Sequence, residues 1–217
     1  MSEKPEATGA RAPAAATLTR EEKRDARRHE ILEAAERVFA RSGYWNATTV
    51  DVAKEVGLTQ PALYRYFDSK RTLFVEALVL REWEGVEAYV RAVQHPGSAL
   101  DRLRALTRSA LELTLAHPDM GRLRVQAAVV AAEDEEIREL VRTARRSLRS
   151  AYERLIRQGQ EDGSVRSDAV PAAAAATLVS IAHDCDVGLV LGDDESGTTQ
   201  AAATLETYLD SLSASPA

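Results

Sequence analysis

Residues 48–74 read TTVDVAKEVGLTQPALYRYFDSKRTLF and predict two short helices joined by a tight turn. Thr48 and Thr49 are N-cap residue types, and they stand directly ahead of an apolar stripe with three-to-four spacing. Thr59 can cap the second helix, whose first turn tolerates Pro61 because no helical N–H partner is needed there. The stretch is typical of a helix-turn-helix unit.

The second helix of this unit has two unlike sides. Steps of about 100° per residue bring Leu63 and Phe67 together on one side, which must face the core. The opposite side carries Pro61, Ala62 and Arg65, and Gln60 lies at the N-terminal tip, where it can enter a groove end-on. Tyr64 and Tyr66 flank that side, where hydroxyl groups can reach phosphates on the two strands. The layout suits a helix in a DNA major groove, although two packed helices of any all-α domain would share the pattern.

Composition indicates a folded chain of modest charge. Its 217 residues are 45% hydrophobic, contain a single cysteine and carry a net charge of −6. One cysteine forms no internal disulfide, so a cytoplasmic location is expected. Counted along the sequence, residues 20–81 carry +2 and residues 82–217 carry −8. Any contacts with phosphates must therefore be few and placed, since the N-terminal part has no strong general positive field.

Helical periodicity continues to the C-terminus, which predicts an all-α fold of about nine helices. Residues 1–19 have no apolar core of signal-peptide type and are expected to form a disordered arm. Asp168 is the predicted cap of the eighth helix. Besides the two short helices, we expect helices at about 20–42, 70–93, 98–116, 120–132, 135–160, 169–191 and 198–212.

The first of these helices begins with a basic cluster: Arg20, Lys23, Arg24, Arg27 and Arg28. This cluster is expected either to touch the DNA backbone or to form ion pairs within the protein.

The helix at 169–191 carries no charge from residue 169 to residue 182. A membrane span needs about 20 apolar residues, whereas charged residues interrupt this helix, so we expect burial against another helix and no membrane. His183, Asp184 and Asp186 follow, but consecutive helical side chains diverge by about 100° and cannot converge on one ion. No metal site is expected. Asp184 or Asp186 is expected either to face a cationic effector or to be a polar residue at an interface or helix end.

With this order laid out, the chain resembles the TetR-type family of transcriptional regulators. The resemblance is sharpest from Ile31 to Phe74, in the apolar first helix, the Thr-Thr cap, the AKEVGL turn, the LYRYF reader and the Ser-Lys foot. It implies an N-terminal three-helix DNA-binding domain at 20–70 and an effector-binding and dimerisation domain at 71–217. Residues implied to bind phosphates are Thr49, Tyr64, Tyr66 and Lys70, and residues implied to approach bases are Gln60, Pro61, Ala62 and Arg65. Val50 stands where some members have a base-reading arginine, so that contact is not expected.

The resemblance further implies a homodimer through the helices at about 169–191 and 198–212, with a ligand pocket in the C-terminal domain. Candidate residues for this effector pocket, each also explicable as ordinary core or surface, are Trp83, Tyr89, Met120, Gln126, His183 and Asp184. The expected function is repression from a palindromic double-stranded DNA operator, with release by a small-molecule effector. The alternative is a helical dimer that binds only protein partners. The scattered histidines and the lack of a phosphate-cradling loop predict no catalysis and no cofactor.

Overall fold

The computed structural model describes residues 19–192 and 195–214 and, within these ranges, every side chain except those of residues 81–84 and 195–198. The described residues form nine helices and no strand, which confirms the predicted fold class. These helices are α1 (Arg20–Asn46), α2 (Thr49–Glu55), α3 (Gln60–Leu63), α4 (Lys70–Val93), α5 (Ala99–Ala116), α6 (Pro118–Val130), α7 (Glu135–Glu161), α8 (Pro171–Leu191) and α9 (Glu195–Leu212). The predicted disordered arm, residues 1–19, lies outside the described residues except for residue 19.

Side-chain caps set the starts of most of these helices. Thr19, Thr48 and Ser98 each accept a hydrogen bond from a backbone N–H three residues later, and the acidic residue there bonds back to the cap. Such reciprocal bonds satisfy N–H groups that have no partner inside the helix. One predicted cap is wrong: α8 starts after Val170 without a side-chain cap, and Asp168 instead pairs with a neighbouring arginine.

The end of α1 differs from its prediction in a way that glycine explains. Gly43 has a φ of 78°, a left-handed value at which a side chain would be strained, so the regular helix breaks where it was expected to end. A further turn then continues to Asn46. It places Tyr44 in a ring cluster with Phe39 and Phe74, with the Tyr44 and Phe74 ring centroids 4.7 Å apart.

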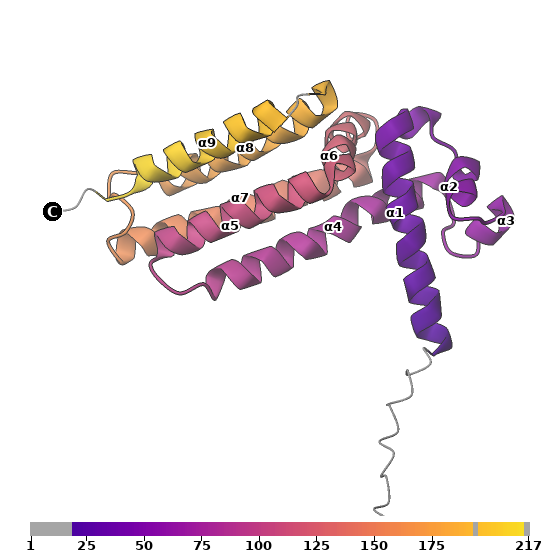
Figure 1. Ribbon diagram of the computed structural model, residues 1–217, viewed down its shortest axis with the longest axis horizontal. Coiled ribbons are helices and arrows are strands. Elements are labelled where there is room, and N and C mark those ends of the chain that lie inside the picture. The colour runs from indigo at the N-terminus through magenta and orange to yellow at the C-terminus, as the bar shows by residue number, and fades with distance from the viewer. Residues whose placement is uncertain (1–18, 193–194, 215–217) are drawn as a thin grey trace, which may run out of the picture.

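The buried apolar side chains form two cores along an elongated molecule (Figure 1). In Figure 1, α1, α2 and α3 lie together at one end, α6 lies beside α1, and the remaining helices run lengthwise away from them. The first core belongs to α1–α3 but also takes Leu73, Phe74 and Ala77 from α4 and Leu123 and Ala127 from α6. The first core therefore continues across residues 70 and 71, the predicted domain boundary, because α4 and α6 pack onto α1–α3.

The second core joins the far part of α4 to α5, α7, α8 and α9. Helix α8 is long and apolar enough to span a membrane by length and composition, and one third of its most apolar stretch is buried within this chain. Ala174, Ala175, Leu178 and Val179 provide its buried side. The opposite side carries small residues that remain open.

Candidate nucleic-acid interface and effector site

The short helix α3 is fixed by its buried side. Leu63 and the following Phe67 are enclosed in the first core, as the helical spacing predicted. The Thr59 side chain accepts a hydrogen bond from the backbone N–H of Ala62, which caps the helix. The regular helix ends at Leu63, and turns carry the chain on to Tyr66, so α3 is only 4 residues long.

The outward side of α3 carries the predicted contact residues. Gln60, Pro61, Tyr64 and Arg65 are exposed, whereas Ala62 and Tyr66 are partly covered. Within the described part of the chain, the Arg65 guanidinium has no hydrogen bond or ion pair to another residue, so it is free to reach outward. An exposed arginine between two tyrosines can offer hydrogen-bond donors to a base edge and hydroxyls to phosphates.

Thr49 organises this surface from below. Its side chain is only 6% exposed. The Gln60 amide donates to its hydroxyl oxygen over 2.9 Å, and the Tyr64 hydroxyl lies 3.3 Å from the same atom. The hydroxyl therefore positions the Gln60 and Tyr64 side chains, whereas the backbone N–H of Thr49 lies in the first turn of α2, where such groups lack helical partners.

Lys70 is engaged inside the protein. Its ammonium donates to three backbone carbonyls at the end of α1, those of Tyr44 at 2.8 Å, Trp45 at 3.1 Å and Ala47 at 3.1 Å. It also lies 4.8 Å from the centre of the Tyr44 ring. The last carbonyls of a helix have no partner within it, so this lysine closes α1. Sequence reasoning missed this role because Lys70 and its acceptors are more than 20 residues apart.

The basic residues at the start of α1 were expected either to touch DNA or to form ion pairs within the protein, and they do not all behave alike. Arg27 donates to the carbonyl of Val56 over 2.7 Å, which holds the turn between α2 and α3. Arg28 donates to the carbonyl of Tyr66 over 2.6 Å, pairs with Glu76 and lies 4.3 Å from the centre of the Phe67 ring. Both arginines therefore position the reader from within. The earlier basic residues of the cluster are exposed.

Among the described side chains, only Gln126 of the predicted effector-pocket residues lines the cavity described below. The Trp83 side chain lies outside the described residues. Tyr89 packs on the second core and accepts hydrogen bonds from Arg154 at 3.3 Å. Met120 is buried in the packing of α6, and Asp184 is exposed. Gln126 donates to the carbonyl of Phe39 over 2.9 Å and so ties α6 to α1.

The polar residues of α8 are explained by a buried ion pair. Asp186 is 4% exposed and accepts two hydrogen bonds from Arg124 of α6, that from Nε over 2.8 Å. Arg124 also donates to the Thr114 hydroxyl over 3.1 Å, which brings α5 into the same network. His183 Nδ1 lies 3.8 Å from this carboxylate. Across the described residues, no three metal-binding side chains come together.

A cavity of about 460 Å³ is present elsewhere, between α1, α6 and the end of α8. Of the candidate pocket residues, Gln126 is in its lining, which is otherwise rich in arginine. Because α1 packs with α2 and α3, this cavity lies where that end of the molecule meets the C-terminal helices.

Comparison with known proteins identifies the family. Residues 31–77 match the family model for bacterial regulatory proteins of the tetR family. Residues 99–214, more than half of the chain, match the model for the C-terminal part of the BetI-type transcriptional repressor. The chain therefore belongs to the TetR family of DNA-binding transcriptional regulators.

Individual relatives agree with this assignment. A nucleoid occlusion factor SlmA from a Marinomonas strain is 31% identical over 54% of this chain and 58% of its own length. The HTH-type transcriptional regulator YfiR of Bacillus subtilis is 30% identical over 67% of this chain and 71% of its own.

Solved structures share the whole architecture. A regulator from Saccharomonospora viridis, in complex with choline, superimposes with a TM-score of 0.74 at 25% identity, over 86% of this chain and 96% of that one. The ketosteroid regulator KstR2 of Mycobacterium tuberculosis gives 0.70 at 21% identity, over 86% and 95%. The likeness to KstR2, at 21% identity, concerns the fold alone.

Proposed function

We propose that the protein is a dimeric cytoplasmic repressor that binds a palindromic operator through α3 and is released by a small-molecule effector. The observation that carries the proposal is the outward surface of α3, where the exposed Arg65 has no hydrogen bond or ion pair to any described residue and the buried Thr49 hydroxyl holds Gln60 and Tyr64. Preorganised side chains lose little freedom on binding, which favours specific contacts over general attraction. In this proposal Arg65 and Gln60, with Pro61 and Ala62 beside them, approach the bases.

The proposed phosphate contacts come from the flanks of the same surface. In this proposal the Tyr64 and Tyr66 hydroxyls bind phosphates of the two strands, and the Thr49 N–H in the first turn of α2 binds another phosphate. Lys70 belongs to this group in a different way: its ammonium is held by carbonyls, so it acts on the operator mainly by fixing the turn that precedes α2.

Dimerisation is proposed through α8 and α9. The open side of α8 consists of small side chains, which let two helices approach closely: Ala172, Ala173, Ala176, Thr177 and Ser180. A partner on this side would cover an apolar helix that is otherwise incompletely buried. Replacing Ser180 by arginine places a charge in that contact. Sedimentation equilibrium should then report a monomer for Ser180→Arg and a dimer for the unchanged protein.

The effector is proposed to bind among the C-terminal helices and to favour a form with a different spacing of the two readers. A ligand shifts such an equilibrium only by its differential affinity for the two forms. The choline complex of the Saccharomonospora regulator, which shares this fold, supports a small-molecule effector. It does not determine the charge of the effector here, because Asp186 is already paired with Arg124 and Asp184 is exposed.

Retention of DNA in a gel tests the reader directly. The probe is the DNA upstream of the gene, and Arg65→Ala is compared with Arg149→Ala, an exposed arginine of α7 far from α3. Loss of a bidentate base contact costs about 1–3 kcal/mol, so Arg65→Ala should bind roughly 5-fold to 150-fold more weakly. Arg149→Ala should match the unchanged protein. A helical dimer that binds only proteins would retain none of this DNA.

A further inference from the structure

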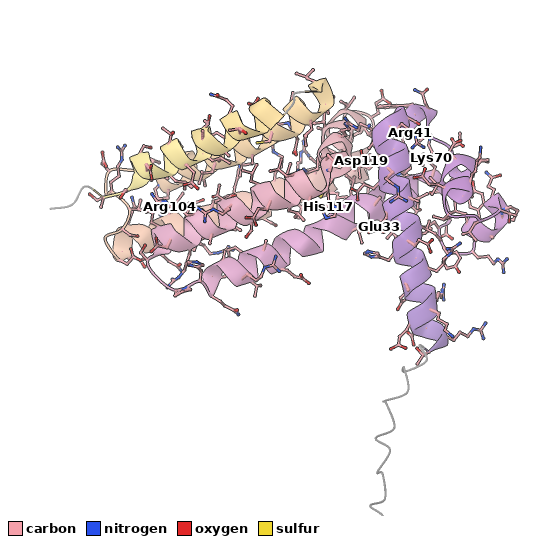
Figure 2. The ribbon with its side chains drawn as sticks, viewed as in Figure 1. Glu33, Arg41, Lys70, Arg104, His117 and Asp119 are labelled. Carbon is pink, nitrogen blue, oxygen red and sulfur yellow. The ribbon has the colours of Figure 1, made fainter. Side chains whose placement is uncertain are left out.

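The cavity between α1, α6 and the end of α8 carries an inference of its own. Its volume of about 460 Å³ lies within the range of small-molecule sites, roughly 300–1,000 Å³. Arg37 and Arg41 enter it from α1, Arg122 and Asp119 from α6, and Val190 from α8. Figure 2 shows Arg41 on α1 and Asp119 at the start of α6 beside the same junction.

The charge of the lining favours an anion. Arg37 and Arg41 share one carboxylate, that of Glu55, at 2.8 and 3.2 Å. Asp119 lies 3.6 Å from the Arg122 guanidinium, beyond a good hydrogen bond. Three guanidinium groups therefore face two carboxylates, in a chain whose net charge is −6.

The three guanidinium groups also have unused donors. Each guanidinium has five N–H bonds. Toward the described residues, Arg37 donates through Nε and Arg41 through Nη2. Arg122 donates through Nε to the carbonyl of Leu189 over 3.3 Å. The remaining N–H groups can bind a carboxylate in the two-pronged geometry that arginine favours.

The rest of the cavity wall is mainly apolar, so it suits a ligand that has an apolar part beside its negative charge. Ala40, Val125 and Val190 line the cavity, and Val190 is 46% exposed. At the inner side, Gln126 points its amide nitrogen at the carbonyls of Phe39 and Ala40, which fixes its orientation. Its oxygen is buried and has no hydrogen-bond partner among the described residues.

We propose that this cavity binds an organic carboxylate with an apolar body. The carboxylate pairs with Arg41 and Arg122, while the apolar body lies against Val125 and Val190. The ligand thereby joins α1, which carries the DNA-binding end, to α6 and α8. Its effect on operator affinity rests on the proposed function, whereas the binding itself does not.

Titration calorimetry on the full-length protein tests the binding without DNA. The probes are 2-naphthoate, the neutral 2-naphthamide and the cationic 2-naphthylmethylammonium, which share one ring system and differ in charge. We expect one 2-naphthoate per chain, with the other two compounds bound at least about tenfold more weakly. Equal binding of 2-naphthoate and 2-naphthamide would overturn the proposal, because the guanidinium groups would then contribute nothing.

Two variants locate the site. Arg122→Gln removes one guanidinium, and Val190→Asp adds a carboxylate at the apolar wall without touching an ion pair of the lining. Each should weaken 2-naphthoate at least about tenfold, and Arg149→Gln on α7 should leave it unchanged. If Val190→Asp, checked for native melting, bound 2-naphthoate as tightly as Arg149→Gln, the anion would bind elsewhere and the proposal would be wrong.

A gel titration with 2-naphthoate then addresses the coupling. A shift of operator affinity that disappears in Val190→Asp supports the junction as a control point. A calorimetric signal without any DNA retention would refute the proposed function and leave the anion site intact, so the two failures are distinguishable.

Discussion

Replacing Lys70 by methionine separates a structural role from a DNA-contacting one. The ammonium donates to three carbonyls at the end of α1, at 2.8, 3.1 and 3.1 Å. Hydrogen bonds that involve a charged group are worth about 1.5–3 kcal/mol, and this side chain is partly open to water, so we expect a loss of about 2 kcal/mol. A chain of this length loses roughly 2–4 °C in Tm per kcal/mol, which predicts a fall of about 4–8 °C.

Circular dichroism melts at a fixed protein concentration measure this fall, since dimer stability depends on concentration. Lys54→Met is the matched control: it removes the same charge from an exposed position on α2 and should lower stability by no more than about 0.5 kcal/mol. Equal melting temperatures for Lys70→Met and Lys54→Met would refute the structural role of Lys70. If Lys70 bound a phosphate instead, Lys70→Met would make the slope of log K against log salt less steep by about one and would leave the melting temperature unchanged.

Three further changes address the junctions between helices. Asp186→Asn leaves the partly buried Arg124 guanidinium without its carboxylate partner, so the free energy of unfolding in urea should fall by about 2–3 kcal/mol. Arg71 holds the pKa of the Asp134 carboxyl well below its usual range, so that pair stabilises the fold above about pH 4 and weakens as the pH falls. Arg71→Gln should therefore flatten the loss of stability below about pH 4 in acid unfolding curves. Gly121→Ala places a methyl 3.0 Å from Asp186 Oδ1 and Leu189 Cδ1, and since Asp186 is pinned, stability should fall by about 1 kcal/mol.

Each of these changes has a control in the same chain. Asp184→Asn alters an exposed carboxylate of α8 and should change unfolding by no more than about 0.5 kcal/mol. Arg149→Gln removes an exposed arginine of α7, and its acid unfolding curve should keep the shape of the unchanged protein. Gly85→Ala adds a methyl in open space on α4 and should raise stability by up to about 1 kcal/mol. If Gly121→Ala were as stable as Gly85→Ala, the prediction would be wrong, because α6 and α8 would then be able to move apart and make room for the methyl group.

The elements that sequence could predict are those with local causes. The capping box of Ser98 with Asp101 lies within four residues, and the break at Gly43 follows from one dihedral angle. The inward side of α3 follows from the spacing of Leu63 and Phe67. These features depend on neighbours along the chain, so they are visible before the chain is folded.

The roles that sequence reasoning missed depend on contacts between distant segments. Lys70 has a phosphate-binding residue type at a helix foot, yet its acceptors are carbonyls of the preceding helix. Asp186 has the residue type expected of a cation site, yet Arg124 reaches it from 62 positions away. The arginine-lined cavity joins three helices, and no periodicity within one helix predicts which helices meet there.

Nuclease footprinting of the full-length protein on the DNA upstream of its gene tests the central claim, that α3 reads a two-fold symmetric operator. We predict two protected half-sites about one helical turn apart, 10–10.5 bp centre to centre or a multiple of that, with protection lost in Arg65→Ala and kept in Arg149→Ala. Absence of a protected region, or protection that survives Arg65→Ala unchanged, would contradict the assignment of α3 as the reader.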